Sequence, residues 1–128
     1  MRTKRILVAD SDLRVRSALH ILLLQEPGPI AVAECPDLDS LVEQLVAFQP
    51  HLVLLDWDLP GRPAPALLFG RHPPASRAKL IVLCQYPEAR QAALAVGADD
   101  FVYKGDPPDM LLAACRKVLD HAGEKLTA

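Results

Sequence analysis

The sequence has few of the residues that mark disulfide-linked, metal-binding or membrane proteins. Only three of its 128 residues are cysteines, and Cys35, Cys84 and Cys115 lie too far apart to form a zinc or redox motif. No apolar run approaches the roughly 18 residues of a membrane-spanning helix, and the run near the N-terminus is too short for a signal peptide. We therefore expect a cytoplasmic protein with reduced thiols and no membrane association.

The sequence also lacks an excess of basic charge. Its 14 lysines and arginines are outnumbered by 16 aspartates and glutamates, giving a formal net charge of −2, whereas a nucleic-acid-binding domain needs a basic face. No repeat, low-complexity tract or linker divides the chain, and 51% hydrophobic residues suffice for one well-buried core. We predict a single domain over residues 1–128, with no output domain in this chain and no nucleic-acid binding by it.

Five short apolar runs are the most regular feature that is present. They lie at residues 5–10, 30–35, 51–56, 79–84 and 100–104. Most of them are continuous rather than alternating, which is typical of strands that are covered on both faces. Each run therefore predicts a strand of a parallel sheet.

Apolar residues with helical spacing lie between and after these runs. The segments are 15–23, 38–46, 88–96, 111–119 and, more weakly, 64–71 among prolines. Asp37 is a candidate N-cap for the second helix. The alternation predicts an α/β protein: a single-domain (βα)5 three-layer sandwich with right-handed crossovers and a five-stranded parallel sheet. In the strand order 2-1-3-4-5, strands 1 and 3 are neighbours at the switch point where such sheets bind ligands.

Polar side chains end several of the predicted strands. Asp10 ends the first, Asp56 the third, Cys84 the fourth and Lys104 the fifth, so we expect the two acids side by side with the lysine reaching over them. Adjacent carboxylates repel each other unless a cation lies between them, and an all-oxygen site with few protein ligands suits Mg²⁺. An aspartate there can act as a nucleophile, and the lysine can hold the oxygens of a phosphoryl group.

Three stretches together, ILVADSD, LLDWDLPG and GADDFVYK, resemble the receiver domain of two-component response regulators. That family is a phospho-acceptor module with a flavodoxin-like fold, and the resemblance covers nearly the whole chain. It implies that Asp56 accepts the phosphoryl group, that Asp10 and Asp56 hold Mg²⁺ together with the backbone carbonyl of Asp58, and that Lys104 contacts the phosphoryl group. Lys104 can also pair with Asp56 when no metal is present.

The resemblance further implies partners and a switch. A sensor histidine kinase or a phosphotransfer protein donates the phosphoryl group, and Phe101 occupies the position of an aromatic switch residue. The altered surface around helix 4, strand 5 and helix 5 then binds a downstream partner, whose identity the sequence does not give, or a second copy in a homodimer. Such a domain catalyses only its own phosphorylation and dephosphorylation, so we expect no enzyme acting on a separate substrate.

The sequence departs from the family pattern at three positions. Ser11 replaces the second acid after strand 1, which leaves Ser11 itself or Asp12 to complete the metal site, although one of them is expected to cap the first helix. Cys84 stands where the family has Ser or Thr, and a thiol is a weaker hydrogen-bond donor than a hydroxyl. Gly105 replaces the proline that usually follows the lysine. We interpret Cys84 as a small buried hydrophobic residue rather than a reactive thiol.

Two alternative functions remain open on the sequence. The departures also fit a degenerate receiver, a protein-interaction module that works without phosphorylation. The Asp56-Trp57-Asp58 stretch in turn satisfies the Asp-x-Asp signature of phosphohydrolases of the haloacid dehalogenase type, in which the first acid attacks and the second is the general acid/base. That signature normally ends the first strand of its fold, however, and here it ends the third.

Overall fold

The computed structural model describes residues 2–62, 64–69 and 78–127. The strands are β1 (Lys4–Ala9), β2 (Ile30–Cys35), β3 (Leu52–Asp56), β4 (Lys79–Cys84) and β5 (Asp100–Tyr103). The helices are α1 (Leu13–Leu24), α2 (Leu38–Ala47), α3 (Pro65–Phe69), α4 (Arg90–Ala95) and α5 (Pro108–Thr127), and a 3₁₀ turn, η1 (Pro87–Ala89), precedes α4. The strands form one parallel sheet in the order β2-β1-β3-β4-β5, so the predicted fold class is confirmed.

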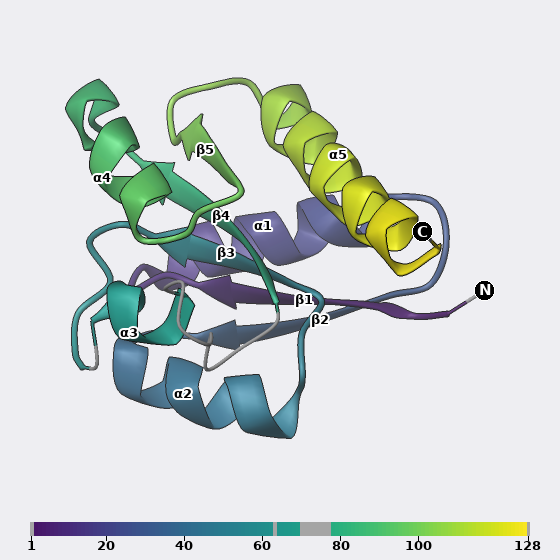
Figure 1. The fold of residues 1–128 in the computed structure, drawn as a ribbon, viewed down its shortest axis with the longest axis horizontal. Coiled ribbons are helices and arrows are strands. Elements are labelled where there is room, and N and C mark those ends of the chain that lie inside the picture. Colours follow the sequence, from purple (N-terminus) through teal and green to yellow (C-terminus); the bar gives the residue numbers. More distant parts are fainter. Residues whose placement is uncertain (1, 63, 70–77, 128) are drawn as a thin grey trace.

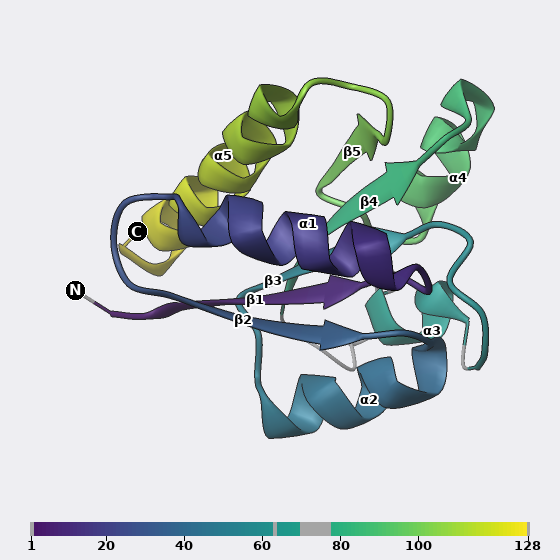
Figure 2. The same cartoon turned by 180° about the vertical axis from the view of Figure 1, so that it is seen from behind.

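The helices cover both faces of the sheet, which explains why the strand sequences are apolar throughout. Helices α1 and α5 lie on one face, and α2, α3 and α4 lie on the other (Figures 1 and 2). Every residue of β3, the central strand, is buried. Because successive side chains of a strand point to opposite faces, a strand covered in this way needs an apolar residue at every position.

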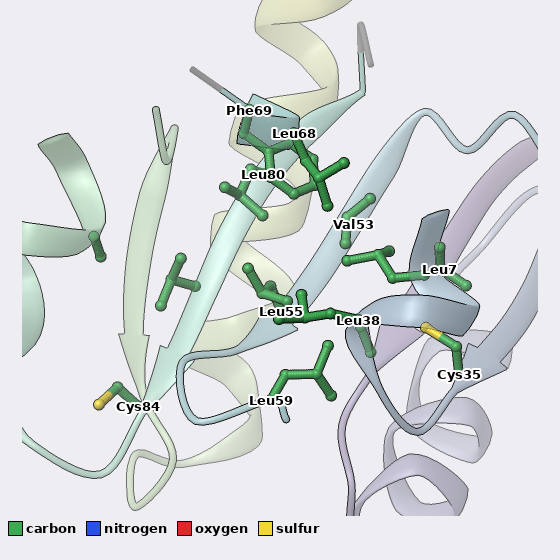
Figure 3. Close-up of a cluster of buried hydrophobic side chains, with 14 of the residues drawn as sticks. Leu7, Cys35, Leu38, Val53, Leu55, Leu59, Leu68, Phe69, Leu80 and Cys84 are labelled. Atoms are coloured by element: carbon green, nitrogen blue, oxygen red, sulfur yellow. The ribbon is translucent and has the colours of Figure 1, made fainter. Parts of the chain in front are cut away.

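This alternation divides the buried side chains into two clusters, one on each face. The cluster beneath α2, α3 and α4 includes Val82 and, among the residues labelled in Figure 3, Leu7, Val53, Leu55 and Leu80. The cluster beneath α1 and α5 includes Ile6, Val8, Leu52, Leu54 and Ile81. The two clusters fix the sheet between the helix layers, so that the carboxyl ends of the strands form a stable edge.

The second helix begins where the sequence predicts. Asp37 has extended backbone dihedrals (φ −154°, ψ 171°), and its carboxylate accepts a hydrogen bond from the backbone N–H of Ser40 at 2.7 Å. This bond satisfies one of the unpaired donors of the first helical turn. The prediction that Asp37 caps this helix is confirmed.

The other helices differ from the prediction mainly in length. Helix α3 has only five residues, and positions 70 and 71 of the predicted segment lie outside the described residues. Helix α5 starts at Pro108, since proline suits the first helical position, and extends to Thr127, well beyond the predicted end at 119. The apolar periodicity marked the part of α5 that contains Leu111, Ala114, Cys115 and Val118, which are buried. None of the helices in the described ranges is long and apolar enough to cross a membrane.

Gly97, just after α4, is a position that only glycine fits. Its φ is +104°, and a Cβ atom built on it would lie 2.1 Å from the carbonyl oxygen of Phe69. We expect Gly97→Ala to lower the free energy of unfolding by about 2 kcal/mol or more, because it adds backbone strain and a clash with main chain. Gly105→Ala is the matched control, since a Cβ there meets nothing within 4 Å. Urea unfolding measures both, and equal stabilities would contradict the prediction.

Candidate functional site

Three charged side chains converge at the carboxyl edge of the sheet. The Lys104 Nζ lies 2.8 Å from Asp10 Oδ2 and 3.2 Å from Asp56 Oδ1. Asp56 ends β3, Asp10 directly follows the neighbouring strand β1, and the lysine directly follows β5. The structure thus brings together the three residues that the strand ends predicted. Lys104 pairs with Asp56 as expected, but its hydrogen bond goes to Asp10.

The sheet itself sets the positions of these residues, because its hydrogen-bond pattern continues just past the strand ends. The backbone N–H of Asp10 donates to the carbonyl of Cys35 at 3.1 Å, and that of Lys104 donates to the carbonyl of Cys84 at 2.9 Å. After Asp56, the N–H of Trp57 donates to the carbonyl of Leu83 at 2.9 Å. The backbone at the site is therefore held by neighbouring strands.

Both acids are buried, and both lie next to the ammonium group of Lys104. Asp10 is 2% exposed and Asp56 is 6% exposed, and they are the only buried charged residues in the described part of the chain. Burial acts to lower the pKa of Lys104, but the hydrogen bond to Asp10 and the charges of Asp56 and Asp10 outweigh it, so the pKa is raised. A protonated lysine between two carboxylates leaves one negative charge uncompensated.

The Asp56 carboxylate has one occupied oxygen and one that is open. Its Oδ1 accepts a hydrogen bond from the backbone N–H of Asp58 at 3.1 Å and pairs with Lys104. Among the residues that the structure describes, neither a hydrogen bond nor an ion pair falls on Oδ2. This oxygen is therefore the one available to attack an incoming electrophile.

The donor set suits Mg²⁺ with few protein ligands. No three His, Cys, Asp or Glu side chains within the described ranges gather closely enough to hold a metal by themselves. Mg²⁺ is commonly bound through one or two carboxylates and keeps several waters, and Asp10 and Asp56 supply such a pair with one uncompensated charge. The two carboxylates would hold the ion. Asp58 is exposed, and its backbone carbonyl stays the predicted third ligand.

The structure decides between the two residues after Asp10 that the sequence offered as the cap of the first helix. Asp12 is the N-cap of α1, because its Oδ1 accepts a hydrogen bond from the backbone N–H of Arg14 at 2.8 Å. Its own N–H donates to Asp10 Oδ1 at 2.9 Å. Ser11 is exposed. The capping role that we expected for one of these two residues thus belongs to Asp12.

Cys84, at the end of β4, and Phe101, on β5, are both buried. Cys84 is 1% exposed (Figure 3), and its Sγ accepts a hydrogen bond from the backbone N–H of Tyr86 at 3.3 Å. Phe101 is 8% exposed and packs edge-on against Tyr103, with ring centroids 5.2 Å apart. The burial expected of Cys84 is confirmed. Trp57, next to Asp56, is half-buried and packs against the same cluster.

The other two thiols are also buried and poorly suited to chemistry. Burial, followed by the charge of Asp37, raises the pKa of Cys35 to about 12. Burial, followed by the charge of Glu26, raises the pKa of Cys115 to about 12. Since the thiolate is the reactive form, neither is a nucleophile at neutral pH.

A group of side chains that contacts the backbone of Asp10 was not predicted from the sequence. Arg16 Nη1 donates to the Asp10 carbonyl at 2.7 Å, and Arg16 Nε lies 3.3 Å from Glu34 Oε1. The other Glu34 oxygen lies 2.8 Å from His20 Nδ1. One signal was available: Glu34 is the only acid in the otherwise apolar run IAVAEC. Buried or half-buried acids in such runs need a partner.

A hollow opens next to Lys104, between α1 and the start of α5. Its volume is about 310 Å³. Its lining is mostly apolar and includes Val15, Ala18, Leu19, Pro107 and Pro108. At the same edge, Leu13 at the start of α1 is 63% exposed. The charged site is thus bordered by an apolar surface.

Comparisons with known proteins agree with this geometry. A family model for the response regulator receiver domain matches residues 6–116. The chain is 32% identical over 122 residues to the phosphate regulon transcriptional regulatory protein PhoB of Escherichia coli (strain K12), which covers 91% of this chain and 52% of that protein. The chain spans about half the length of the curated relatives it matches.

Two solved structures extend the likeness to the backbone. The BeF3-activated N-terminal receiver domain of Klebsiella pneumoniae RstA is 26% identical, with a TM-score of 0.78, over 91% of this chain and 98% of that chain. A CheY-like response regulator receiver domain protein from Methanospirillum hungatei JF-1 is 25% identical, with a TM-score of 0.79, over 97% of this chain and 99% of that chain.

Proposed function

The chain belongs to the response regulator receiver domain family, and on that basis we propose that it accepts a phosphoryl group on Asp56. One observation carries the proposal: Asp10, Asp56 and Lys104 meet at the switch point of the sheet, and Asp56 keeps one carboxylate oxygen open. A purely structural ion pair would account for the presence of the lysine, but it would not account for two buried acids beside a single cation. A second cation and an anionic substrate complete the charge balance.

The chemistry is a phosphoryl transfer between two side chains. Asp56 Oδ2 attacks the phosphorus of a phosphohistidine, so the O–P bond forms as the N–P bond breaks, and the released imidazole takes a proton from water. Positioning and charge stabilisation supply most of the rate in such transfers. Lys104 moves from the carboxylates to the added phosphoryl oxygens. Bound Mg²⁺ supplies further positive charge for those oxygens.

The donor is a sensor histidine kinase or a histidine-containing phosphotransfer protein. Its imidazole must reach Asp56 Oδ2, so its surface must cover the sheet edge. The exposed Leu13 and the hollow beside Lys104 offer apolar contact area at that edge, and burial of apolar surface drives most protein association.

The output passes through the surface formed by α4, β5 and α5. Leu94 on α4 and Met110 on α5 are exposed, as is Tyr86 just before η1, and these side chains suit a downstream protein or a second copy of this chain. Cys84 and Phe101 connect this surface to the site. A degenerate receiver is the second candidate, and one observation at Cys84 favours it. The Cys84 sulfur already accepts a hydrogen bond from the backbone N–H of Tyr86, and a thiol is a weak donor to a phosphoryl oxygen.

Incubation with a small acyl phosphate and Mg²⁺ tests the proposal. We expect a mass gain of one phosphoryl group, located on the peptide that contains Asp56, and a change in the fluorescence of Trp57, the only tryptophan. BeF3⁻ with Mg²⁺ should give the same change without transfer. Absence of both responses in the folded protein would support the degenerate receiver. Repeated turnover of a phosphomonoester would instead support a phosphohydrolase.

A further inference from the structure

Asp10 uses every one of its polar groups in a defined contact. Its N–H donates to Cys35, its Oδ1 accepts from the N–H of Asp12, its Oδ2 accepts from Lys104, and its carbonyl accepts from Arg16. Two of these contacts are made by main-chain groups, of Cys35 and Asp12, and two by the side chains of Lys104 and Arg16. The contact to the carbonyl, at 2.7 Å, comes from Arg16, six residues further along the chain, and this long side chain must itself be held in place.

Arg16 is held by Glu34. The guanidinium spans from the Asp10 carbonyl on one side to Glu34 Oε1 on the other, and its side chain is only 14% exposed. Glu34 lies on β2, and its second oxygen is fixed by His20. An arginine fork can bridge two acceptors in this way, whereas the single ammonium of a lysine is less well matched to it.

We propose that Arg16 is a positioning residue for the Mg²⁺ and phosphoryl site, acting through the main chain of Asp10; this rests on the proposed function. Ser11 replaces the second acid of the family pattern and Asp12 caps α1. The affinity for the metal therefore depends strongly on the orientation of the Asp10 carboxylate. By donating to the Asp10 carbonyl, Arg16 holds the peptide group between Asp10 and Ser11 and so fixes the orientation of that carboxylate. Glu34 neutralises the charge of Arg16. The guanidinium can therefore lie close to the Mg²⁺ site without repelling the ion strongly.

The sign of the effect on Mg²⁺ affinity separates positioning from simple electrostatics. Removal of a positive charge near a cation site should strengthen Mg²⁺ binding by Coulomb's law. Loss of a residue that orients a ligand should weaken it, typically by tenfold or more. We therefore expect Arg16→Met to raise the Kd for Mg²⁺ by about tenfold, opposite to the Coulomb prediction.

Titration of the full chain with MgCl₂, followed by Trp57 fluorescence, makes this measurement, and thermal unfolding without Mg²⁺ reports the fold. Arg16→Lys keeps the charge and serves if Arg16→Met does not fold; its Kd should also rise. Arg14→Met is the matched control, because Arg14 is exposed on the same helix, and its Kd should not rise.

The outcomes distinguish the inference from the proposal it rests on. Unchanged or lower Kd values in both Arg16 variants, with normal Mg²⁺ binding by the parent protein, overturn the positioning role alone. The same holds if the variants only lower the melting temperature. A parent protein that binds neither Mg²⁺ nor a phosphoryl group overturns both.

Discussion

Asp56→Asn is expected to reduce phosphorylation by a small acyl phosphate roughly a thousandfold or more, which means to background. An amide has no nucleophilic oxygen of comparable basicity, while its shape still allows an acceptor for the N–H of Asp58, which now binds Oδ1 at 3.1 Å. The loss should therefore come from the chemistry and not from the fold. Intact-protein mass after a fixed incubation with Mg²⁺ measures it.

Asp58→Asn is the matched control two residues away. Asp58 is exposed, and the substitution keeps its backbone N–H and carbonyl, so we expect phosphorylation to persist. In a phosphohydrolase the second acid of the Asp-x-Asp pair is the general acid/base, and the same substitution would then remove turnover. A phosphoryl group that still appears in Asp56→Asn would assign the acceptor elsewhere and refute the proposal.

The central part of the site could be predicted because topology determines it. Asp10 and Lys104 are 94 positions apart and hydrogen-bonded, yet both follow apolar runs, and the carboxyl ends of parallel strands share one edge. Continuous apolar runs also identified β3 as a strand covered on both faces. These predictions needed only periodicity and the position of the first polar residue after each run.

The features that were missed depend on side-chain reach and on short elements. Arg16 lies among the polar residues of α1, and nothing in its spacing shows that it folds back to the Asp10 carbonyl. The preference of Lys104 for a hydrogen bond with Asp10 is a matter of tenths of an ångström. Helix α3, with five residues between prolines, is too short for a periodic pattern.

Lys104→Met should lower the free energy of unfolding by about 3 kcal/mol without Mg²⁺, near the lower end for breaking a buried ion pair. The Asp10 and Asp56 side chains are 2% and 7% exposed, and the lysine side chain is 19% exposed. Little water can therefore reach the two carboxylates to solvate them once the ammonium group is removed. Without the lysine, two buried carboxylates face each other with no cation between them, and their repulsion destabilises the folded state. Urea unfolding at neutral pH measures the loss.

The same charge argument predicts what should restore stability in Lys104→Met. Millimolar Mg²⁺ should recover much of the loss, since binding to the folded state stabilises it, and adding Asp56→Asn should recover part of it by removing one of the opposed charges. Lys79→Met is the control: its 3.8 Å pair with Asp99 is partly exposed and worth at most about 1 kcal/mol. Lys104→Met could instead lower the free energy of unfolding no more than Lys79→Met does, with no recovery on adding Mg²⁺. The two acids would then not share a site that needs a cation, and the charge balance that supports phosphorylation on Asp56 would be refuted.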